Sequence, residues 1–331
     1  MVLIHGISVI IILLYILCLI TRYCNTTPRK MIIDTDAGGD DALAIMLALM
    51  YETKTHDIEI LAITATYGNT YLKNVEQNVL KTLTIANRSD IPVYSGAQKP
   101  LINIYENTNY FGKDGFGDFN FTKTITAKVD KSKHASVLLV ELVKQYPGIC
   151  EITIVTLGSL TTIATAIALE PNFLHLVKRH IIMGSNIDSN IIEFNFKQDP
   201  ESDWIVLNNT NKPSIILPSN TVYANSISKE EYRNIYNNLD ISIANFLYQA
   251  ERIGLEKTEM WEPADGIAMA SALQPEMITE RCKTNLRPVI AGDARGSVVK
   301  DIDTNNQVCN AEIIQNVNIT IFKNLLLEYL S

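Results

Sequence analysis

Hydrophobic positions alternate along the chain, from residue 31 onwards, between short runs rich in Ile, Val and Thr and longer runs with helical spacing. The short runs predict strands over residues 31–34, 58–68, 150–158, 180–184 and 213–219. The longer runs predict helices over residues 40–52, 72–86, 135–147 and 160–171. Apolar strands that alternate with helices are typical of a parallel sheet that is covered on both faces. The pattern therefore predicts one α/β domain, over residues 31–331, with a mostly parallel central sheet and helices on both faces.

Ligand sites in such sheets lie beyond the carboxyl ends of the strands. The densest polar cluster in that position is DTDAGGDDA, residues 34–42. Its four carboxylates belong to Asp34, Asp36, Asp40 and Asp41. The first two lie two positions apart at a strand end, so an extended chain points them to one side. Gly38 and Gly39 permit a tight turn, and the last two acids then open a helix, where the positive end of the helix dipole favours them.

Three interpretations of this acidic cluster are open. A helix cap in a solvated acidic loop accounts for one or two of the carboxylates. A D-x-D motif at a strand end also serves phosphoryl-transfer enzymes, with an aspartate nucleophile and magnesium. A bound hard cation accounts for all four carboxylates. Oxygen ligands without a neighbouring His or Cys favour calcium or magnesium over zinc.

The composition of the chain narrows the choice of partners. Its 331 residues are 47% hydrophobic, which is enough to bury a large core, and it contains no internal repeat or low-complexity tract. A net charge of −8 argues against a nucleic acid or an anionic membrane surface as the partner.

The first residues stand apart from the rest. Residues 2–20 are almost wholly apolar and precede Arg22, Arg29 and Lys30, which predicts a signal peptide or membrane anchor over residues 1–24, with a buried N-terminal element as the alternative. Either leading interpretation implies a secreted protein, or one that touches the membrane only through this segment. Glycosylation sequons agree with the secretory route, at Asn25, Asn87, Asn120, Asn208 and Asn318.

The string DTD followed by AGGDDALA resembles the amino-terminal signature of the nucleoside hydrolases, the inosine-uridine preferring family. That family typically has Pro where this chain has Ala37 and a larger apolar residue where it has Gly39, and neither difference removes a carboxylate. Later segments are similar to the family's in the same order: ATYGNTYLKNVEQN, VTLGSLTTIATAIALEP, IIEFNFKQDPESDWIVL, WEPADGIAMASALQPE and GDARGSVVKD. The resemblance runs from residue 31 to residue 331. It implies calcium-dependent hydrolysis of the N-glycosidic bond of ribonucleosides to ribose and free base, by a homodimer or homotetramer.

The resemblance also implies a metal site and a catalytic base. Calcium would be held by Asp36, Asp41, the main-chain carbonyl of Leu157 and Asp265. Asp36 would in addition act as the general base on a water held by the cation, and Asp34 would support the site from behind.

Ribose recognition is implied by the same matching segments. The 2′- and 3′-hydroxyls would be held by Asp40, Asn195 and Asp265. The 5′-hydroxyl would be held by Glu193 and Asn186, with Asn190 as a rival for the latter. The match also places Asn69 at the active site.

The base end of the substrate is less well defined. One subgroup of the family has His immediately before the last metal-binding aspartate, and this chain has Ala264 there. Another subgroup favours purines and stacks the base between aromatic rings, a role open to Trp261, Tyr223 and either Phe111 or Phe116. The sequence therefore favours purine nucleosides. The rival hypotheses are a nucleoside-binding protein of the same fold with impaired catalysis, and a magnesium-dependent phosphohydrolase.

Overall fold

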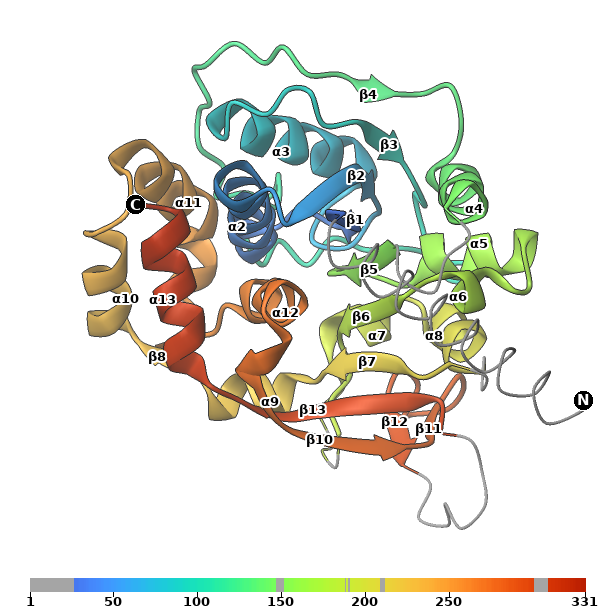
Figure 1. Cartoon of the computed structure of the whole chain (residues 1–331). Coiled ribbons are helices and arrows are strands. Elements are labelled where there is room, and N and C mark those ends of the chain that lie inside the picture. The colour runs from blue at the N-terminus through green and yellow to red at the C-terminus, as the bar shows by residue number, and fades with distance from the viewer. Residues whose placement is uncertain (1–26, 147–151, 188, 190, 209–211, 301–308) are drawn as a thin grey trace, which may run out of the picture.

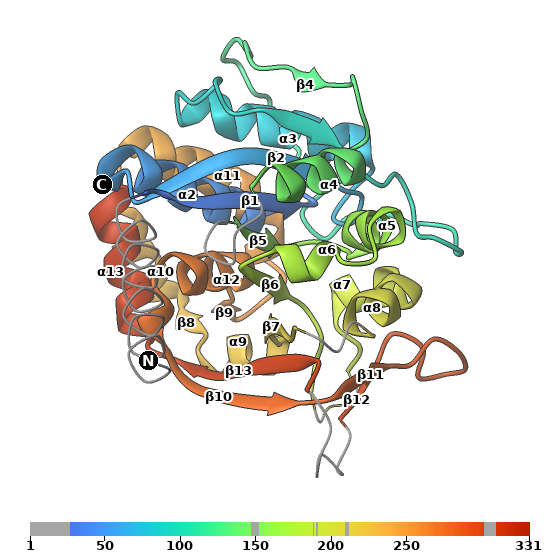
Figure 2. The same ribbon diagram turned by 45° about the vertical axis from the view of Figure 1, so that its right-hand side comes forward.

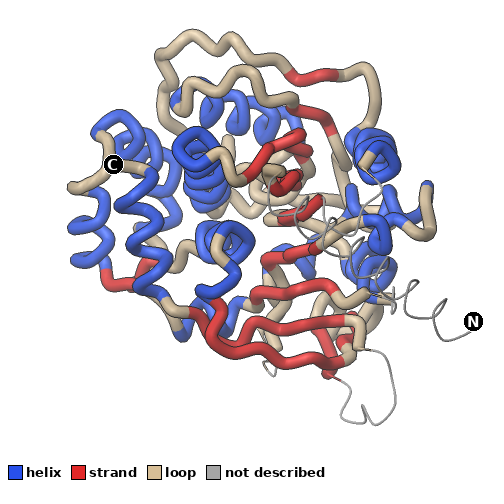
Figure 3. The backbone as a smooth tube through the Cα atoms, in the orientation of Figure 1, coloured by secondary structure: helices blue, strands red, loops and turns tan. Residues whose placement is uncertain are grey.

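The computed structural model describes residues 27–146, 152–187, 189, 191–208, 212–300 and 309–331. Its central feature is a nine-stranded sheet, in the order β10-β13-β7-β6-β5-β1-β2-β3-β4, which forms one twisted layer through the molecule (Figure 3). Its strands are β1 (Arg29–Thr35), β2 (Ile58–Ala65), β3 (Val93–Ser95), β4 (Val129–Asp130), β5 (Ile152–Thr156), β6 (Arg179–Met183), β7 (Ser214–Leu217), β10 (Ile278–Thr284) and β13 (Ala311–Val317). Neighbouring strands are parallel except for β10 and β13. The predicted, mostly parallel sheet is confirmed.

Helices cover both faces of this sheet (Figure 1). The first face shares its hydrophobic core with α2 (Gly39–Thr55), α3 (Leu72–Ile85), α9 (Ser219–Ala224), α10 (Lys229–Tyr236), α11 (Ile241–Leu255), α12 (Ala264–Leu273) and α13 (Ile319–Tyr329). The second face is covered by α4 (Ala135–Gln145), α5 (Thr161–Leu169), α6 (Phe173–Leu176), α7 (Phe194–Gln198) and α8 (Pro200–Leu207). Helices on both faces were predicted, and the structure confirms them.

The two cores explain why the strands read as unbroken apolar runs. In β1, Met31 and Ile33 belong to the first core, whereas Ile32, which points the other way, belongs to the second. A strand that is covered on both faces needs apolar side chains at consecutive positions. Helix α2 is apolar all round for a related reason: its residues 43–49 are fully buried between the sheet and the neighbouring helices α11, α12 and α13.

Two short antiparallel sheets lie outside the central one. Strand β8 (Ile227–Ser228) pairs with β9 (Met260–Trp261), and β11 (Leu286–Pro288) pairs with β12 (Val298–Lys300) in a hairpin late in the chain. The hairpin lies beside α8 (Figure 2), where Arg295 donates to both carboxylate oxygens of Glu201 at 2.5 and 2.7 Å. Gly296 in the same loop packs against Ile192 and Lys197. The hairpin therefore braces the segment that precedes α8.

The predicted signal peptide or anchor over residues 1–24 lies outside the described residues. Within the described ranges, no helix combines the length and hydropathy needed to cross a membrane. The sequon at Asn25 is likewise outside them, whereas the asparagines of the other sequons, Asn87, Asn120, Asn208 and Asn318, have exposed side chains.

Candidate functional site

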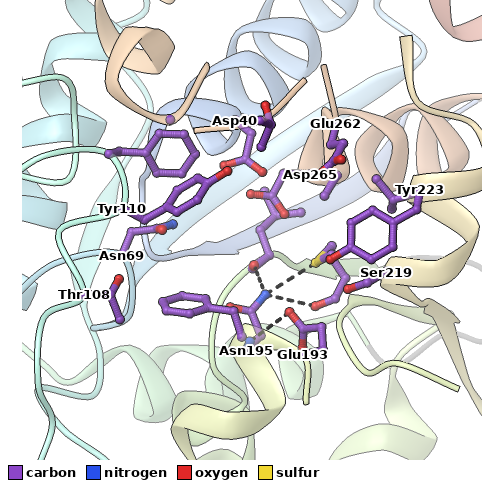
Figure 4. Close-up of a pocket in the computed structure, with 18 of the residues that line it drawn as sticks. Asp40, Asn69, Thr108, Tyr110, Glu193, Asn195, Ser219, Tyr223, Glu262 and Asp265 are labelled. Carbon is purple, nitrogen blue, oxygen red and sulfur yellow. Dashed lines mark hydrogen bonds between the residues drawn. The ribbon is translucent and has the colours of Figure 1, made fainter. Parts of the chain in front are cut away.

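A cavity of about 440 Å³ opens at the carboxyl edge of the sheet. Five neighbouring strands bring residues to its wall, because each contributes from its carboxyl end or from the segment that follows. These residues are Leu157 after β5, Met183 at the end of β6, Ser219 after β7, Asp40 after β1 and Asn69 after β2. Figure 4 shows Asp40 and Asp265 on one side of this cavity and Glu193 and Asn195 on the other. Parallel topology thus gathers side chains that are far apart in the sequence.

Asp34 lies behind the cavity rather than in its wall. Its side chain is fully buried, Oδ2 accepts a hydrogen bond of 2.5 Å from Thr64 Oγ1, and Oδ1 has no partner. Burial raises the pKa of Asp34 to about 7, although the Thr64 hydrogen bond opposes this shift. Its main-chain carbonyl accepts from the N–H of Leu157 at 2.8 Å, which ties the end of β1 to the segment after β5.

Asp36 is enclosed by main chain on two sides. A Cβ at Gly68 would overlap Oδ2 of Asp36, and a Cβ at Gly158 would lie 2.9 Å from its Cβ. Oδ2 accepts from the Asn69 N–H at 2.6 Å, whereas Oδ1 is buried without a partner. Burial, and then the charge of Asp41, raise the pKa of Asp36 well above its usual value. The carboxylate therefore has a fixed position and one oxygen without a hydrogen-bond partner.

Asp41 acts as a helix cap, in agreement with the cap interpretation for one of the four acids. Its carboxylate accepts from the N–H of Gly38 at 2.8 Å, from Thr35 Oγ1 at 2.5 Å and from Asn69 Nδ2 at 3.1 Å. Asn69 consequently holds two aspartates at once, through its main chain and its side chain. This arrangement fixes the start of α2 relative to the end of β1.

The residues present fit a hard cation. Asp40, Asp41 and Asp265 can each present an oxygen within 4.8 Å of the others. Burial first, and neighbouring carboxylates second, raise the pKa of Asp40 to about 7 and the pKa of Asp265 well above its usual value. No ion pair among the described residues brings a Lys or Arg to these groups or to Asp36. A set of oxygen donors without a counter-charge suits calcium or magnesium.

Glu193 and Asn195 form the opposite wall of the cavity. Glu193 caps α7: it accepts from the N–H groups of Asn195, Phe196 and Ser185 at 2.9–3.0 Å, and burial raises its pKa to about 7. Asn195 Nδ2 donates to the main-chain oxygen of Leu157 at 2.7 Å. A carbonyl oxygen has a second lone pair, so this contact leaves Leu157 one position for a further ligand.

Two of the expected substrate ligands lie differently from the rest. Asn186 is buried beside this region with an unpartnered Oδ1, but it is not one of the residues that line the cavity. Its rival Asn190 lies outside the described residues. Trp261 does line the cavity, yet it is only 3% exposed, because its ring packs edge-to-face on Tyr232 and Tyr236.

The other aromatic candidates divide clearly. Phe116 is fully buried against Phe119 and Phe246, away from the cavity. Phe111 lines the cavity, and so does Tyr223, which is 47% exposed. Tyr223 therefore offers an accessible ring to a bound ligand.

The amino-acid pattern from residue 31 to residue 324 matches the model of the inosine-uridine preferring nucleoside hydrolases. The chain belongs to this family. It is 37% identical over 186 residues to the inosine-uridine preferring nucleoside hydrolase of Leishmania major, which covers 55% of this chain and 57% of that protein. The alignment with this relative thus spans little more than half its length.

Other members of the family match over a greater length. The chain is 29% identical over 267 residues to the pyrimidine-specific ribonucleoside hydrolase RihA of Escherichia coli O81 (strain ED1a), covering 75% of this chain and 81% of that protein. Among solved structures, the Inosine-Guanosine Nucleoside Hydrolase (IG-NH) superposes with a TM-score of 0.83 at 26% identity, over 91% of this chain and 98% of that one. The predicted nucleoside hydrolase fold is confirmed.

This member of the nucleoside hydrolase family departs from the common pattern at residues 37 and 39. Ala37 has a left-handed φ of 34°, and its N–H donates to Thr35 Oγ1 at 3.0 Å, so the family's Pro would not fit this conformation. Gly38, expected to make the turn, has an ordinary φ of −80°. Gly39 serves close packing instead, because a Cβ there would lie 2.9 Å from Glu251 Cα in α11.

Sequence reasoning missed several cavity residues of this family member, chiefly Tyr110 and Glu251. Tyr110 comes from an irregular loop and is held by Lys257, whose Nζ donates to its carbonyl at 2.6 Å and lies 5.0 Å from its ring centroid. Glu251 is a buried acid within α11, which is otherwise apolar towards the core. In the sequence, one acidic residue on an apolar helix face marks an unusual position but does not show which residues or ligand it contacts.

Proposed function

We propose that the protein hydrolyses the N-glycosidic bond of ribonucleosides and releases ribose and the free base. The observation that carries this proposal is a single cavity in which Asp40 and Asp265 face Glu193 and Asn195 (Figure 4). Carboxylates and amides bind sugar hydroxyls, and carboxylates stabilise the positive charge that develops on a sugar ring during hydrolysis. Family membership supports the same reaction.

Calcium is the cation that we assign to this site. Asp36, Asp41, Asp265 and the main-chain oxygen of Leu157 would hold it, which gives a use to the unpartnered Oδ1 of Asp36 and to the second lone pair of the carbonyl. When bound, such a cation makes a water easier to deprotonate.

The side chains of the protein then have two roles: one activates the attacking water, and the others hold the ribose hydroxyls. Asp36 takes a proton from the attacking water, as its fixed position at the end of β1 allows. The water oxygen bonds to C1′ while the C1′–N bond breaks, through a sugar with oxocarbenium character. Asp40, Asn195 and Asp265 hold the 2′- and 3′-hydroxyls, and Glu193 with Asn186 holds the 5′-hydroxyl.

Purine nucleosides are the substrates that we favour. Tyr110 and Tyr223 lie on opposite sides of the cavity (Figure 4), and both rings are partly exposed. Two such rings can stack on a flat base, and the larger face of a purine gains more from stacking than a pyrimidine does. This choice replaces the predicted stacking by Trp261, whose ring is already packed against other aromatic rings.

We also propose that the protein follows the secretory route and forms a homo-oligomer. The apolar N-terminal segment and the exposed sequon asparagines support the first point, and family resemblance supports the second. Loss of mass on treatment of the secreted protein with an N-glycosidase, and the mass in solution from light scattering, test the two points separately.

The proposed function is tested with a panel of purine and pyrimidine nucleosides, scored for free ribose with calcium and after chelation. We expect release of ribose, faster from purine nucleosides, that chelation stops and added calcium restores. Absence of ribose from every nucleoside would refute the reaction. Full activity after exhaustive chelation would refute the metal assignment, and binding without turnover would favour the nucleoside-binding alternative.

A further inference from the structure

If the protein hydrolyses nucleosides as proposed, the departing base needs an acid to protonate it, and the residues assigned above do not include one. A departing purine accumulates negative charge on its ring nitrogens and leaves faster if an acid protonates it. Ala264, which lines the cavity next to Asp265, has only a methyl group to offer. Among the described residues, His180 is buried within the sheet and hydrogen-bonded to Thr156 and Ser214, so it cannot serve.

The cavity has one further buried acid, Glu251, which lies close to Gly39 and Asp40. It enters from a different element than Glu193 and Asn195: it comes from α11, together with the apolar or small residues Gly254 and Leu255, whereas they come from the segment around α7. Glu251 is only 2% exposed, so a ligand bound in the cavity is the main non-protein group that its side chain can contact. The wall formed by α11 thus presents one acid among small and apolar residues, which suits a flat base.

The two oxygens of Glu251 have different surroundings. Oε2 accepts a hydrogen bond from the Tyr236 hydroxyl at 3.1 Å, whereas Oε1 is buried and has no hydrogen-bond partner. A buried polar atom without a partner is costly unless a ligand or water satisfies it. Gly39 makes this position possible, because any side chain there would collide with the main chain of Ala250 and Glu251. Tyr236 therefore orients a carboxyl group whose other oxygen remains available.

The protonation state of Glu251 agrees with a role as an acid. Burial first, and the charge of Asp40 second, raise its pKa to about 8, while the hydrogen bond from Tyr236 opposes the shift. The groups that face it are one carboxylate from α2, two phenols from α10, the phenol of Tyr110 and an indole from β9. The adjacent Arg252 donates to the carbonyl of Gly117 instead. At neutral pH the side chain carries the proton that a leaving base needs.

We propose that Glu251 is the general acid that protonates the departing nucleobase. The electron pair of the C1′–N bond goes to the base, and a base nitrogen takes the carboxyl proton of Glu251. Water supplies the hydroxyl to C1′, and its remaining proton passes to Asp36. Transfer of that proton to solvent, and uptake of one by Glu251, restore the starting state, so one water is consumed and one base and one ribose are formed.

The test compares Glu251→Gln with the wild type on two substrates, inosine and 4-nitrophenyl β-D-ribofuranoside, whose phenolate leaves without a proton. We expect kcat/KM for inosine to fall by about 10²–10⁴-fold, with less than about threefold change for the nitrophenyl riboside. Glu256→Gln is the matched control, because Glu256 directly follows the same helix, is exposed and does not line the cavity. It should change neither rate greatly. The retained activity on the riboside also shows that the variant has folded.

Equal losses on both substrates, or no loss on inosine, would overturn the role of Glu251 and leave the proposed function standing. A wild type that cleaves neither compound would overturn both. Tyr236→Phe gives a second reading, since it removes a hydrogen bond that lowers the pKa of Glu251. The alkaline limb of kcat/KM for inosine should then move to higher pH, and no such limb should appear with the nitrophenyl riboside. An unmoved limb would contradict the proposal.

Discussion

Replacement of Asp36 by Asn separates the chemistry of the acidic cluster from its contribution to stability. The amide keeps the shape of the side chain and can still accept from the Asn69 N–H, now 2.6 Å away. It removes one negative charge from a fully buried position, where that charge is also repelled by the charge of Asp41. The proposed base and one proposed calcium ligand disappear together.

The expected changes in rate and stability have opposite signs. A positioned base contributes about 10²–10⁴-fold, so kcat should fall at least that far. Because burial raises the pKa of Asp36 above its value in the unfolded chain, the calcium-free fold loses stability as pH rises from the unfolded pKa through the folded one. A tenfold difference in acidity between the folded and unfolded chains corresponds to about 1.4 kcal/mol, and about 1 kcal/mol moves Tm by about 2 °C in a protein of this size. In chelator at pH 8, the variant should therefore melt a few degrees above the wild type.

Thermal melts with and without calcium measure both effects. Calcium at a hundred times its Kd should stabilise the wild type by about 2.7 kcal/mol, or about 5 °C, and the variant by much less. Asp203→Asn is the matched control. Asp203 is equally buried, both its oxygens lack partners, burial raises its pKa well above the usual value, and it does not line the cavity. This control should gain stability in chelator and keep both turnover and the full response to calcium.

Two outcomes would refute this reasoning. Loss of the cooperative melt in Asp36→Asn would mean that the charge holds the fold together, contrary to the direction in which burial moves its pKa. A full calcium response in the variant would mean that Asp36 is not a ligand of the cation.

Three further predictions concern the turn, the hairpin and pH. Ala37→Pro should lower the free energy of unfolding by about 3 kcal/mol or more, since Pro cannot adopt the observed φ or donate to Thr35. Ala37→Gly should be neutral or stabilising by up to about 1 kcal/mol. Urea melts measure both variants, and equal stability of the two would contradict the strained turn. Arg295→Ala should lower the free energy of unfolding by about 1–2 kcal/mol through loss of two charge-assisted hydrogen bonds to Glu201. It should also raise KM more than it lowers kcat, because the hairpin braces the segment that carries Glu193. An unchanged KM would refute the bracing. The pKa is raised to about 7 at Asp34, Asp40 and Glu193, so the calcium-free protein loses stability as pH rises from about 4 through 7. The Tm gain from calcium should therefore be larger at pH 8 than at pH 5.5. A constant gain would contradict these raised pKa values.

The sequence was sufficient for the sheet and for one side of the cavity because both depend on local pattern. Unbroken apolar runs such as residues 31–33 require two covered faces, and the position of Asp36 directly after such a run places it at the carboxyl edge of the sheet. The match between EFN and the family then placed Glu193 and Asn195 on the same cavity, although nothing local indicates that they face Asp265.

The base end was not predictable from pattern, because it depends on how irregular segments and a surface helix pack. Tyr110 lies in a loop whose position is set by Lys257, more than a hundred residues later. Trp261 looked available for stacking, but contacts with Tyr232 and Tyr236 already cover its ring. Glu251 reaches the cavity only because Gly39 lets α11 approach, a consequence of packing that sequence spacing does not reveal.

The distribution of the cavity residues along the chain also affects the order in which the protein can fold. Asp34, Asp36 and Asp41 are synthesised early, whereas Asp265 opens α12 in the last quarter of the chain. A nascent chain must therefore carry its carboxylate cluster, without the final carboxylate, while most of the sheet is still being made. On the proposed assignment, tight calcium binding becomes possible only when α12 packs against α2, so uptake of the ion would mark the end of folding rather than its beginning.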